Sequence, residues 1–276
     1  MSYEKQFDFD ITAYLHRIGW RAEPAADLAT LRGVHRAHLL SIPFENLDAL
    51  RGTAPSLEVD DLVAKLVHGR RGGYCFEQNT LLAAALEALG FEVTLLTGWV
   101  ALGAEELTSR PRSHQLLLVG VPGDPEHHLA DVGFGAAGGL LEPVPLVADV
   151  EFRTDRRLHR LVHAPRPGPL PLWQLEARTG DSWQPQVGFT LEPFEPVHMV
   201  TQNWYVATHP RSPFAQRLYA QRTLADHHLA VDGRQLVETG ADGTVSVREL
   251  ADEAEVRLVL DERFGIAVPE GTPLSG

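Results

Sequence analysis

Residues 71–79 have the sequence RGGYCFEQN and contain Cys75, the single cysteine of the 276-residue chain. Gly72 and Gly73 allow a sharp backbone turn directly before the thiol. The apolar spacing after Cys75 predicts a helix that ends at Gly90, so the thiol lies at a helix N-terminus. Unpaired N–H groups and the helix dipole stabilise a thiolate there. Cys75 is therefore either a small buried side chain or a nucleophile, and its position alone leaves both interpretations open.

Three further helices are predicted before this one. Asp10 is an N-cap for a helix over 11–18, and Asp27 is an N-cap for a helix over 28–40. A third apolar pattern predicts a helix over 59–68. The first third of the chain is therefore expected to be helical.

The hydrophobic pattern changes after residue 90 from a helical period to short Val-, Thr- and Leu-rich runs. Strands are predicted over 91–102, 114–121, 128–132, 172–178, 198–208, 214–224 and 235–250, the last with a turn at 242–243. The proline-rich segment 142–173 is expected to form short strands and loops, and a final helix is predicted over 252–264. The sequence thus predicts an α+β protein with a helical start, a mostly β middle and a small α/β end.

Two of the predicted strands offer partners for the thiol. If 114–121 and 128–132 form a hairpin that turns near 123–124, paired residue numbers sum to about 247. His114 then faces Gly133, and Asp131 lies diagonally on the same face, within side-chain reach. A register shifted by one residue would place the imidazole and the carboxylate on opposite faces.

Composition and charge exclude several classes of function. With 24 Lys+Arg against 37 Asp+Glu, the net charge of −13 argues against a nucleic-acid or acidic-membrane partner. One cysteine forms no internal disulfide, and a thiolate zinc site needs several, so no metal is predicted. The acidic N-terminus lacks an apolar signal region, and the longest stretch without Asp, Glu, Lys or Arg (196–210) is too short for a membrane span. A cytoplasmic location is the expectation.

The motifs resemble those of one enzyme family. The segment 71–79 is similar to the active-site signature of the arylamine N-acetyltransferases. So are IPFENL at 42–47, SHQLL at 113–117, DVGFG at 131–135 and NWYVATHP at 203–210, in the same order along the chain. The resemblance covers almost the whole sequence.

The resemblance implies a catalytic triad of Cys75, His114 and Asp131. It implies that acetyl-coenzyme A is the co-substrate, with no permanently bound cofactor, and that an arylamine or arylhydrazine accepts the acetyl group by ping-pong kinetics. The implied fold has a helical bundle over 1–90, an antiparallel β-barrel-like domain over 91–200 and an α/β lid over 201–276. The bundle and barrel would share the core of papain-like cysteine enzymes.

Further site residues come from the same resemblance. Phe44 and Phe134 match positions that line the acceptor pocket, with core packing as the alternative role. Trp99, Ser212 and Phe214 match positions near the coenzyme A cleft. The Arg110-Pro111-Arg112 segment differs from many members, and its charge either meets coenzyme A phosphates or belongs to a solvated loop.

Alternative functions keep parts of this site. An amide synthase would take a polyketide chain onto the cysteine and release it as a macrolactam. A cysteine protease or transglutaminase-like enzyme would use the same triad, and a non-catalytic binding module would use none of it. The segment 133–138 (GFGAAG) also matches the dinucleotide pattern G-x-G-x-x-G. Pro143 and Pro145 follow too soon for the helix that this pattern requires, so a nucleotide-binding domain is not expected.

Overall fold

The computed structural model describes residues 9–155 and 157–274, and its N-terminal third is helical as predicted. The elements are α1 (Ile11–Arg17), α2 (Leu28–Ser41), α3 (Leu47–Leu50), α4 (Val59–Leu62), its π-helical continuation η1 (Val63–His68), and α5 (Cys75–Ala88). Asp10 and Asp27 cap α1 and α2, because their carboxylates accept the N–H groups of Ala13 and Thr30. These caps confirm the predicted starts of both helices.

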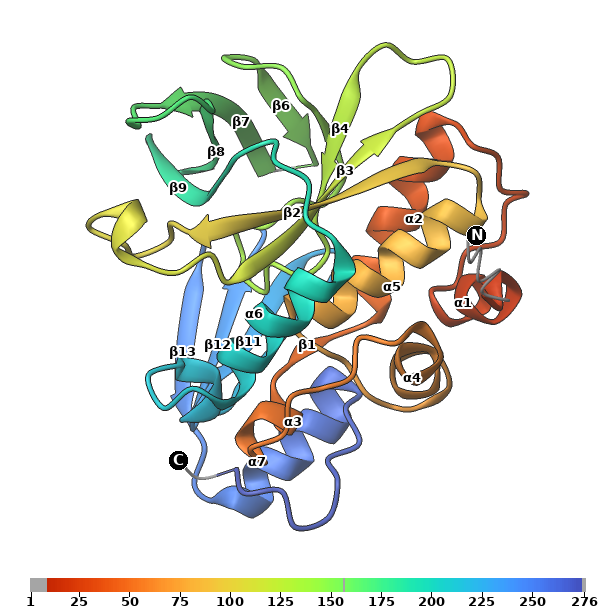
Figure 1. The fold of residues 1–276 in the computed structure, drawn as a ribbon. Coiled ribbons are helices and arrows are strands. Elements are labelled where there is room, and N and C mark those ends of the chain that lie inside the picture. The colour runs from red at the N-terminus through yellow and green to blue at the C-terminus, as the bar shows by residue number, and fades with distance from the viewer. Residues whose placement is uncertain (1–8, 156, 275–276) are drawn as a thin grey trace.

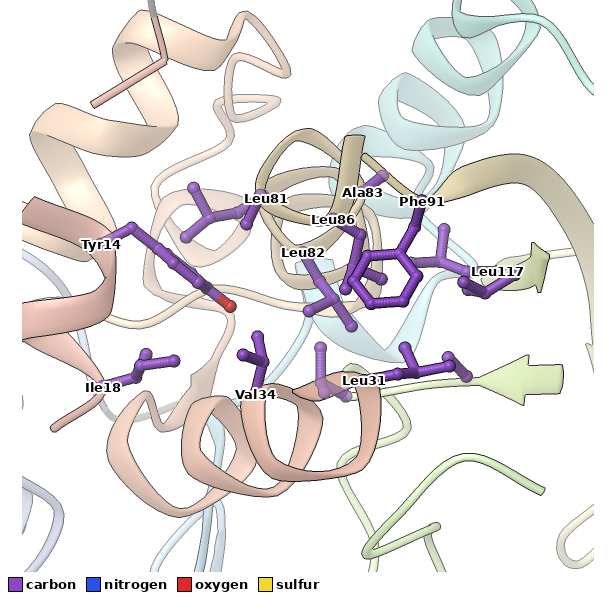
Figure 2. Close-up of a cluster of buried hydrophobic side chains, with 14 of the residues drawn as sticks. Tyr14, Ile18, Leu31, Val34, Leu81, Leu82, Ala83, Leu86, Phe91 and Leu117 are labelled. Atoms are coloured by element: carbon purple, nitrogen blue, oxygen red, sulfur yellow. The ribbon is translucent and has the colours of Figure 1, made fainter. Parts of the chain in front are cut away.

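A shared apolar core fixes α5 against its neighbours. Leu82 and Leu86 of α5 face Leu31 and Val34 of α2, and the cluster continues to Leu117 (Figure 2). All five side chains are fully buried, so each contributes roughly 1.5–3 kcal/mol of hydrophobic stabilisation. The helix that begins at the thiol is therefore held rigidly along its length.

An eight-stranded antiparallel sheet follows α5 and curls into a barrel-like shape (Figure 1). Its strand order is β5-β4-β3-β2-β9-β8-β7-β6. The strands are β2 (Glu92–Val100), β3 (His114–Gly120), β4 (His127–Ala130), β5 (Val144–Pro145), β6 (Glu151–Thr154), β7 (Arg157–Ala164), β8 (Leu172–Thr179) and β9 (Ser182–Phe189), with the short 3₁₀ turn η2 (Leu107–Ser109) between β2 and β3. Buried Leu, Val and Phe side chains fill its interior.

A second antiparallel sheet joins the two ends of the chain. Its order is β1 (Phe44–Glu45), β10 (Tyr219–Thr223), β11 (His227–Asp232), β12 (Gln235–Gly240) and β13 (Val245–Glu249). One face packs on α7 (Glu253–Val259) and its π-helical continuation η4 (Leu260–Phe264). β1, at the edge of this sheet, comes from the N-terminal third; it pairs with β10 on one side and bridges to Gly73, in the segment before α5, on the other.

The predicted strand over 198–208 is wrong, and the predicted strand over 214–224 starts too early. Residues 198–208 belong to helix α6 (Pro196–Thr208), which starts with a proline where no N–H donor is needed. Met199, Asn203 and Val206 are buried at helical spacing, so tertiary packing overrides the strand preference of Trp, Tyr, Val and Thr. The predicted strand 214–224 shortens to β10, because η3 (Pro213–Ala215) forms a turn first.

Three strands, β1, β9 and β11, lie outside the predicted ranges. β9 lies between β2 and β8, and its Pro185 pairs with Glu176 directly beside Gln186, the extra residue of a β-bulge in β9. A proline in the middle of a strand is a signal against strand structure, and the bulge is what accommodates it.

The α+β class with a barrel-like sheet is confirmed. The division into 1–90, 91–200 and 201–276 stays a prediction, and α6 spans the second of its boundaries. Within the described ranges 9–155 and 157–274, every helix is too short or too polar to cross a bilayer. The cytoplasmic location stays a prediction from the sequence.

Candidate active site

Cys75 is the first residue of α5, so its own N–H is among the amides that have no partner within the helix. The side chain is buried, and Sγ lies 3.7 Å from the carbonyl oxygen of Ser113. Ser113 directly precedes β3, which begins at His114. The helix start and the strand start therefore meet at the thiol.

The predicted hairpin has the predicted register. β3 pairs with β4 through Leu117 with Ala130 and Val119 with His128. Extended toward the strand ends, this pairing places His114 diagonally from Asp131, and His114 Nε2 lies 2.6 Å from Asp131 Oδ2. Both side chains are almost fully buried.

The His114–Asp131 pair favours the charged forms of both groups. Burial lowers the pKa of His114, but the Asp131 carboxylate and Cys75 outweigh burial and raise the pKa of His114 to about 10. Burial raises the pKa of Asp131, yet His114 and hydrogen bonds from Asn79 and Gly133 hold it below its usual value. Since Nε2 bonds to Asp131, Nδ1 is the nitrogen left for the thiol.

Asn79 is a functional residue to which the sequence interpretation assigned no role. Its Nδ2 donates to Asp131 Oδ1 at 2.9 Å and to the Gln115 carbonyl at 2.7 Å, and its Oδ1 accepts from Val132 N–H at 3.0 Å. Asn79 thus joins α5 to both strands of the hairpin. Its place one helical turn after Cys75, on the same face of α5, was the available signal.

Gly133 allows the hairpin to approach Cys75 closely. A Cβ at this position would lie 2.6 Å from Cys75 Cα, so any side chain would separate β4 from α5. The Gly133 N–H also donates to Asp131 Oδ1 at 2.9 Å.

His35 of α2 forms a hydrogen bond with the backbone of Asp131. Its Nε2 accepts from the Asp131 N–H at 3.1 Å, which leaves a proton on Nδ1 to donate to the Leu141 carbonyl at 3.2 Å. Burial lowers the pKa of His35 to about 4, so the ring is neutral near pH 7. His35 lies 96 residues before Asp131, and no local pattern in the sequence indicates the contact.

A network of buried side-chain hydrogen bonds holds the turn at Gly72 and Gly73. Gln78 Nε2 donates to the carbonyls of Pro43 at 2.8 Å and Gly73 at 3.2 Å. Gln78 Oε1 accepts from His38 Nε2 at 2.7 Å, and His38 Nδ1 accepts from the Tyr14 hydroxyl at 2.8 Å. Burial lowers the pKa of His38 to about 3, which keeps it neutral in this chain.

Aromatic side chains lie around Cys75 and His114. Phe134 contacts His114 edge-on with ring centroids 5.5 Å apart. Phe44 lies 5.9 Å from Phe214, which in turn lies 6.0 Å from Tyr74. The structure therefore brings Phe44, Phe134 and Phe214 together around the thiol and imidazole, in an apolar setting suited to an aryl group.

A cavity of about 410 Å³ opens beside Ser113. It is lined by Val100, Arg110, Pro111, Ser113, Tyr205, Val206, Arg211, Ser212, Pro213 and Phe214. Arg110 donates to the carbonyls of Leu102 and Gly103, and both arginines are exposed. Two cationic side chains thus line this cavity, although the whole chain is acidic.

Two of the residues predicted to contact coenzyme A have other partners in this structure. The Ser212 hydroxyl donates to the Val206 carbonyl at 2.5 Å. Trp99 is buried under the guanidinium groups of Arg112 and Arg166, at 4.2 and 4.8 Å from the ring centroid. Contact of either residue with coenzyme A stays a prediction.

The segment 133–138 has no dinucleotide-binding geometry. Bends and turns follow it up to β5, without the helix that a G-x-G-x-x-G site needs. Gly135, at φ +62°, instead packs its backbone against Phe44. In the two described ranges, no group of three or more His, Cys, Asp or Glu side chains is arranged to hold a metal ion.

Comparisons with known proteins agree over most of the chain. Residues 27–272 match the family model described as N-acetyltransferase. An arylamine N-acetyltransferase of Mycolicibacterium smegmatis is 39% identical over 259 residues, which cover 93% of this chain and 92% of that protein. The corresponding protein of Escherichia coli K12 is 35% identical over 93% of this chain and 89% of its own length.

Solved structures give the same result. The crystal structure of Nocardia farcinica arylamine N-acetyltransferase superposes with a TM-score of 0.89 and 41% identity, covering 95% of this chain and 91% of its own. The Mycobacterium marinum arylamine N-acetyltransferase in complex with CoA has a TM-score of 0.85 and 34% identity, and covers 93% of both chains.

Proposed function

The chain belongs to the arylamine N-acetyltransferase family, and we propose that it carries the acetyl group of acetyl-coenzyme A as a thioester on Cys75. Arylamines or arylhydrazines are the proposed acceptors. The observation that carries this proposal is the buried His114–Asp131 pair, 2.6 Å apart, at the strand end that meets the first residue of α5. A thiol, an imidazole and an orienting carboxylate are the groups that nucleophilic acyl transfer needs.

In the first half-reaction, His114 holds the thiol proton and Cys75 attacks the thioester carbonyl as a thiolate. Asp131 orients the imidazolium and stabilises its charge. The Cys75 N–H at the start of α5 is the proposed first donor to the oxyanion. The carbon–sulfur bond to coenzyme A then breaks, His114 gives its proton to the departing thiolate, and acetyl-Cys75 remains.

In the second half-reaction, the nitrogen of the acceptor attacks acetyl-Cys75. His114 takes a proton from the nitrogen and returns it to the Cys75 sulfur, and the N-acetyl product leaves. Phe44 and Phe134 are the proposed walls for the aryl ring, since both lie next to the catalytic groups. A dry aromatic wall favours an aryl amine over water as acceptor.

We assign coenzyme A to the cavity beside Ser113. Arg110 and Arg211 supply charge for the phosphate groups, and Phe214 supplies an apolar surface on the way to Cys75. Ser212 lines the same cavity, whereas Trp99 lies outside its lining, beneath Arg112. In this arrangement the donor enters on one side of the triad and the aromatic acceptor pocket lies on the other.

Steady-state kinetics test the proposed order. Initial rates measured over a grid of acetyl-coenzyme A and arylhydrazine concentrations are expected to give parallel double-reciprocal lines, because the two substrates never bind together. The Cys75→Ala variant is expected to show no turnover. Intersecting lines, or turnover by Cys75→Ala, would contradict the thioester route. Hydrolysis of peptides would instead indicate a cysteine protease, and turnover of carrier-bound thioesters without turnover of acetyl-coenzyme A would indicate an amide synthase.

A further inference from the structure

Five ionisable side chains form a cluster below the N-terminus of α5: Glu45, Asp48, Lys65, Arg71 and Glu77. Lys65 Nζ lies 2.5 Å from both Asp48 Oδ2 and Glu77 Oε1. Arg71 bonds to Glu45 Oε1 at 2.7 Å and approaches Asp48 Oδ1 at 3.2 Å. Three carboxylates therefore share two cations, and both Glu45 and Glu77 are fully buried.

Glu77 connects this cluster to the turn that presents the thiol. Its Oε2 accepts the N–H of Tyr74 at 3.2 Å, one residue before Cys75. A Cβ on Gly73 would lie 2.7 Å from the same oxygen, so the backbone follows the surface of this carboxylate. The position of the Glu77 carboxylate consequently fixes the peptide that leads into Cys75.

Lys65 decides whether Glu77 is ionised near neutral pH. Burial raises the pKa of Glu77 to about 7, and the charges of Glu45 and Asp48 add to this, while Lys65 opposes it. These groups approach from β1, α3 and η1. Burial lowers the pKa of Lys65, but the three carboxylates outweigh burial and raise it, so Lys65 remains charged.

We propose that Lys65 and Glu77 form a positioning pair for the nucleophile. The ionised Glu77 carboxylate accepts a hydrogen bond from the Tyr74 N–H, and Lys65 balances the charge of this carboxylate. Without the pair, the turn before Cys75 loses its charge-assisted hydrogen bond, and the thiol is presented less often in its reactive position. The inference rests on the proposed function only for the identity of the nucleophile. It requires neither acetyl-coenzyme A nor an arylamine.

Alkylation of Cys75 by iodoacetamide, followed by intact-mass spectrometry, tests the pair without either substrate. In the unmodified protein the alkylation rate is expected to fall about tenfold as the pH drops through the titration of Glu77, because a hydrogen bond to a charged group is weakened. Glu77→Gln is expected to lose this step in the pH profile, since an amide accepts the Tyr74 N–H without titrating. A Glu77→Gln variant that keeps the step would overturn the proposal.

Removal of the cation gives a second, independent comparison. Lys65→Met is expected to react about tenfold more slowly at neutral pH, because the buried carboxylate then lacks its counter-charge. The double variant Lys65→Met/Glu77→Gln is expected to react as fast as Glu77→Gln alone, because Lys65 acts only through the carboxylate, and a double variant in which the two single losses multiply would contradict the pair. Arg70→Gln is the matched control, since it removes an exposed ion pair with Asp261 outside the cluster and is expected to leave the rate unchanged. If Lys65→Met does not fold, the pH profile of Glu77→Gln alone decides.

Discussion

The proposed catalytic triad and the proposed donor cavity are built in opposite ways, although they meet at Ser113. His114 and Asp131 are buried, and Asp131 is held by α2, α5 and its own hairpin through His35, Asn79 and Gly133. The donor cavity is bordered by the segments around Arg110 and Arg211, which are exposed and reach the surface from two loops.

This difference assigns separate tasks to the two regions. The redundant hydrogen bonds around the triad keep the reacting groups in one geometry, as acyl transfer requires. Loop arginines bind charge without fixing the geometry of the reacting atoms. Changes at the triad should therefore alter kcat, and changes at the donor cavity should alter KM for the donor.

The largest effect is expected from Asp131→Asn. An asparagine still accepts hydrogen bonds from Asn79 and Gly133, but it does not stabilise an imidazolium at His114. We expect kcat to fall by about 10³–10⁴-fold with the fold retained, measured by arylhydrazine acetylation and circular dichroism. If the variant keeps a kcat within about tenfold of the original, Asp131 is not a member of the triad.

The His114–Asp131 pair should also appear in the pH dependence of stability. Because the pKa of His114 rises from about 6.5 to about 10 on folding, its contribution is fully present below about pH 6.5 and is lost as the pH rises through about 10. The free energy of unfolding should fall as the pH rises through this window, by at most about 1.4 kcal/mol per pH unit relative to His114→Gln, because Cys75 gives up a proton when His114 holds one. Urea unfolding of both proteins at a series of pH values measures this. A difference that does not change with pH would contradict the pair.

Asn79→Ala should weaken the junction between α5 and the hairpin. It removes the bonds to Asp131 and Gln115 and leaves the Val132 N–H without its acceptor. We expect a loss of about 2–4 kcal/mol in the free energy of unfolding and about a tenfold loss in kcat. The control is Thr80→Ala on the same helix, whose side chain bonds to Gln115, and which should cost less than about 1 kcal/mol. Equal losses in both variants would show that the junction has no special role.

The smallest effect is expected at the donor cavity. Arg110→Gln combined with Arg211→Gln should raise KM for acetyl-coenzyme A by about tenfold at low salt, and less at high salt, because charge screening weakens the contacts with phosphate. Transfer from preformed acetyl-enzyme to an arylhydrazine should keep its rate. Arg248→Gln, which removes an exposed arginine paired with Glu255, is the control. An unchanged KM would show that the phosphate groups of coenzyme A bind outside this cavity.

Local signals in the sequence predicted most of what positions the triad. The caps Asp10 and Asp27, the helix that starts at Cys75 and the hairpin register of β3 and β4 are confirmed, since caps, periodicity and turn length act over a few residues. Helix α6 was predicted as a strand, because its Trp, Tyr and Val residues favour strands and only tertiary burial makes it helical.

These local signals do not predict contacts between segments that are far apart in the sequence. His35 touches Asp131 across 96 residues, and Phe44 joins β10 across the length of the chain. The pairing of Lys65 with Glu77 depends on how η1 packs against α5, which no spacing in the sequence specifies. The resemblance to a family supplied the identity of the triad, and the structure supplies the groups that hold it.

Acyl transfer is proposed to pass through Cys75, in a site whose geometry does not depend on the donor. The most direct measurement mixes the protein with acetyl-coenzyme A alone, removes the coenzyme A, and follows intact mass and peptide masses before and after an arylhydrazine is added. One acetyl group on the peptide that contains Cys75, released as one equivalent of acetylated product, is the expected result. Acetylation elsewhere, or product formed only when both substrates are present together, would contradict the account.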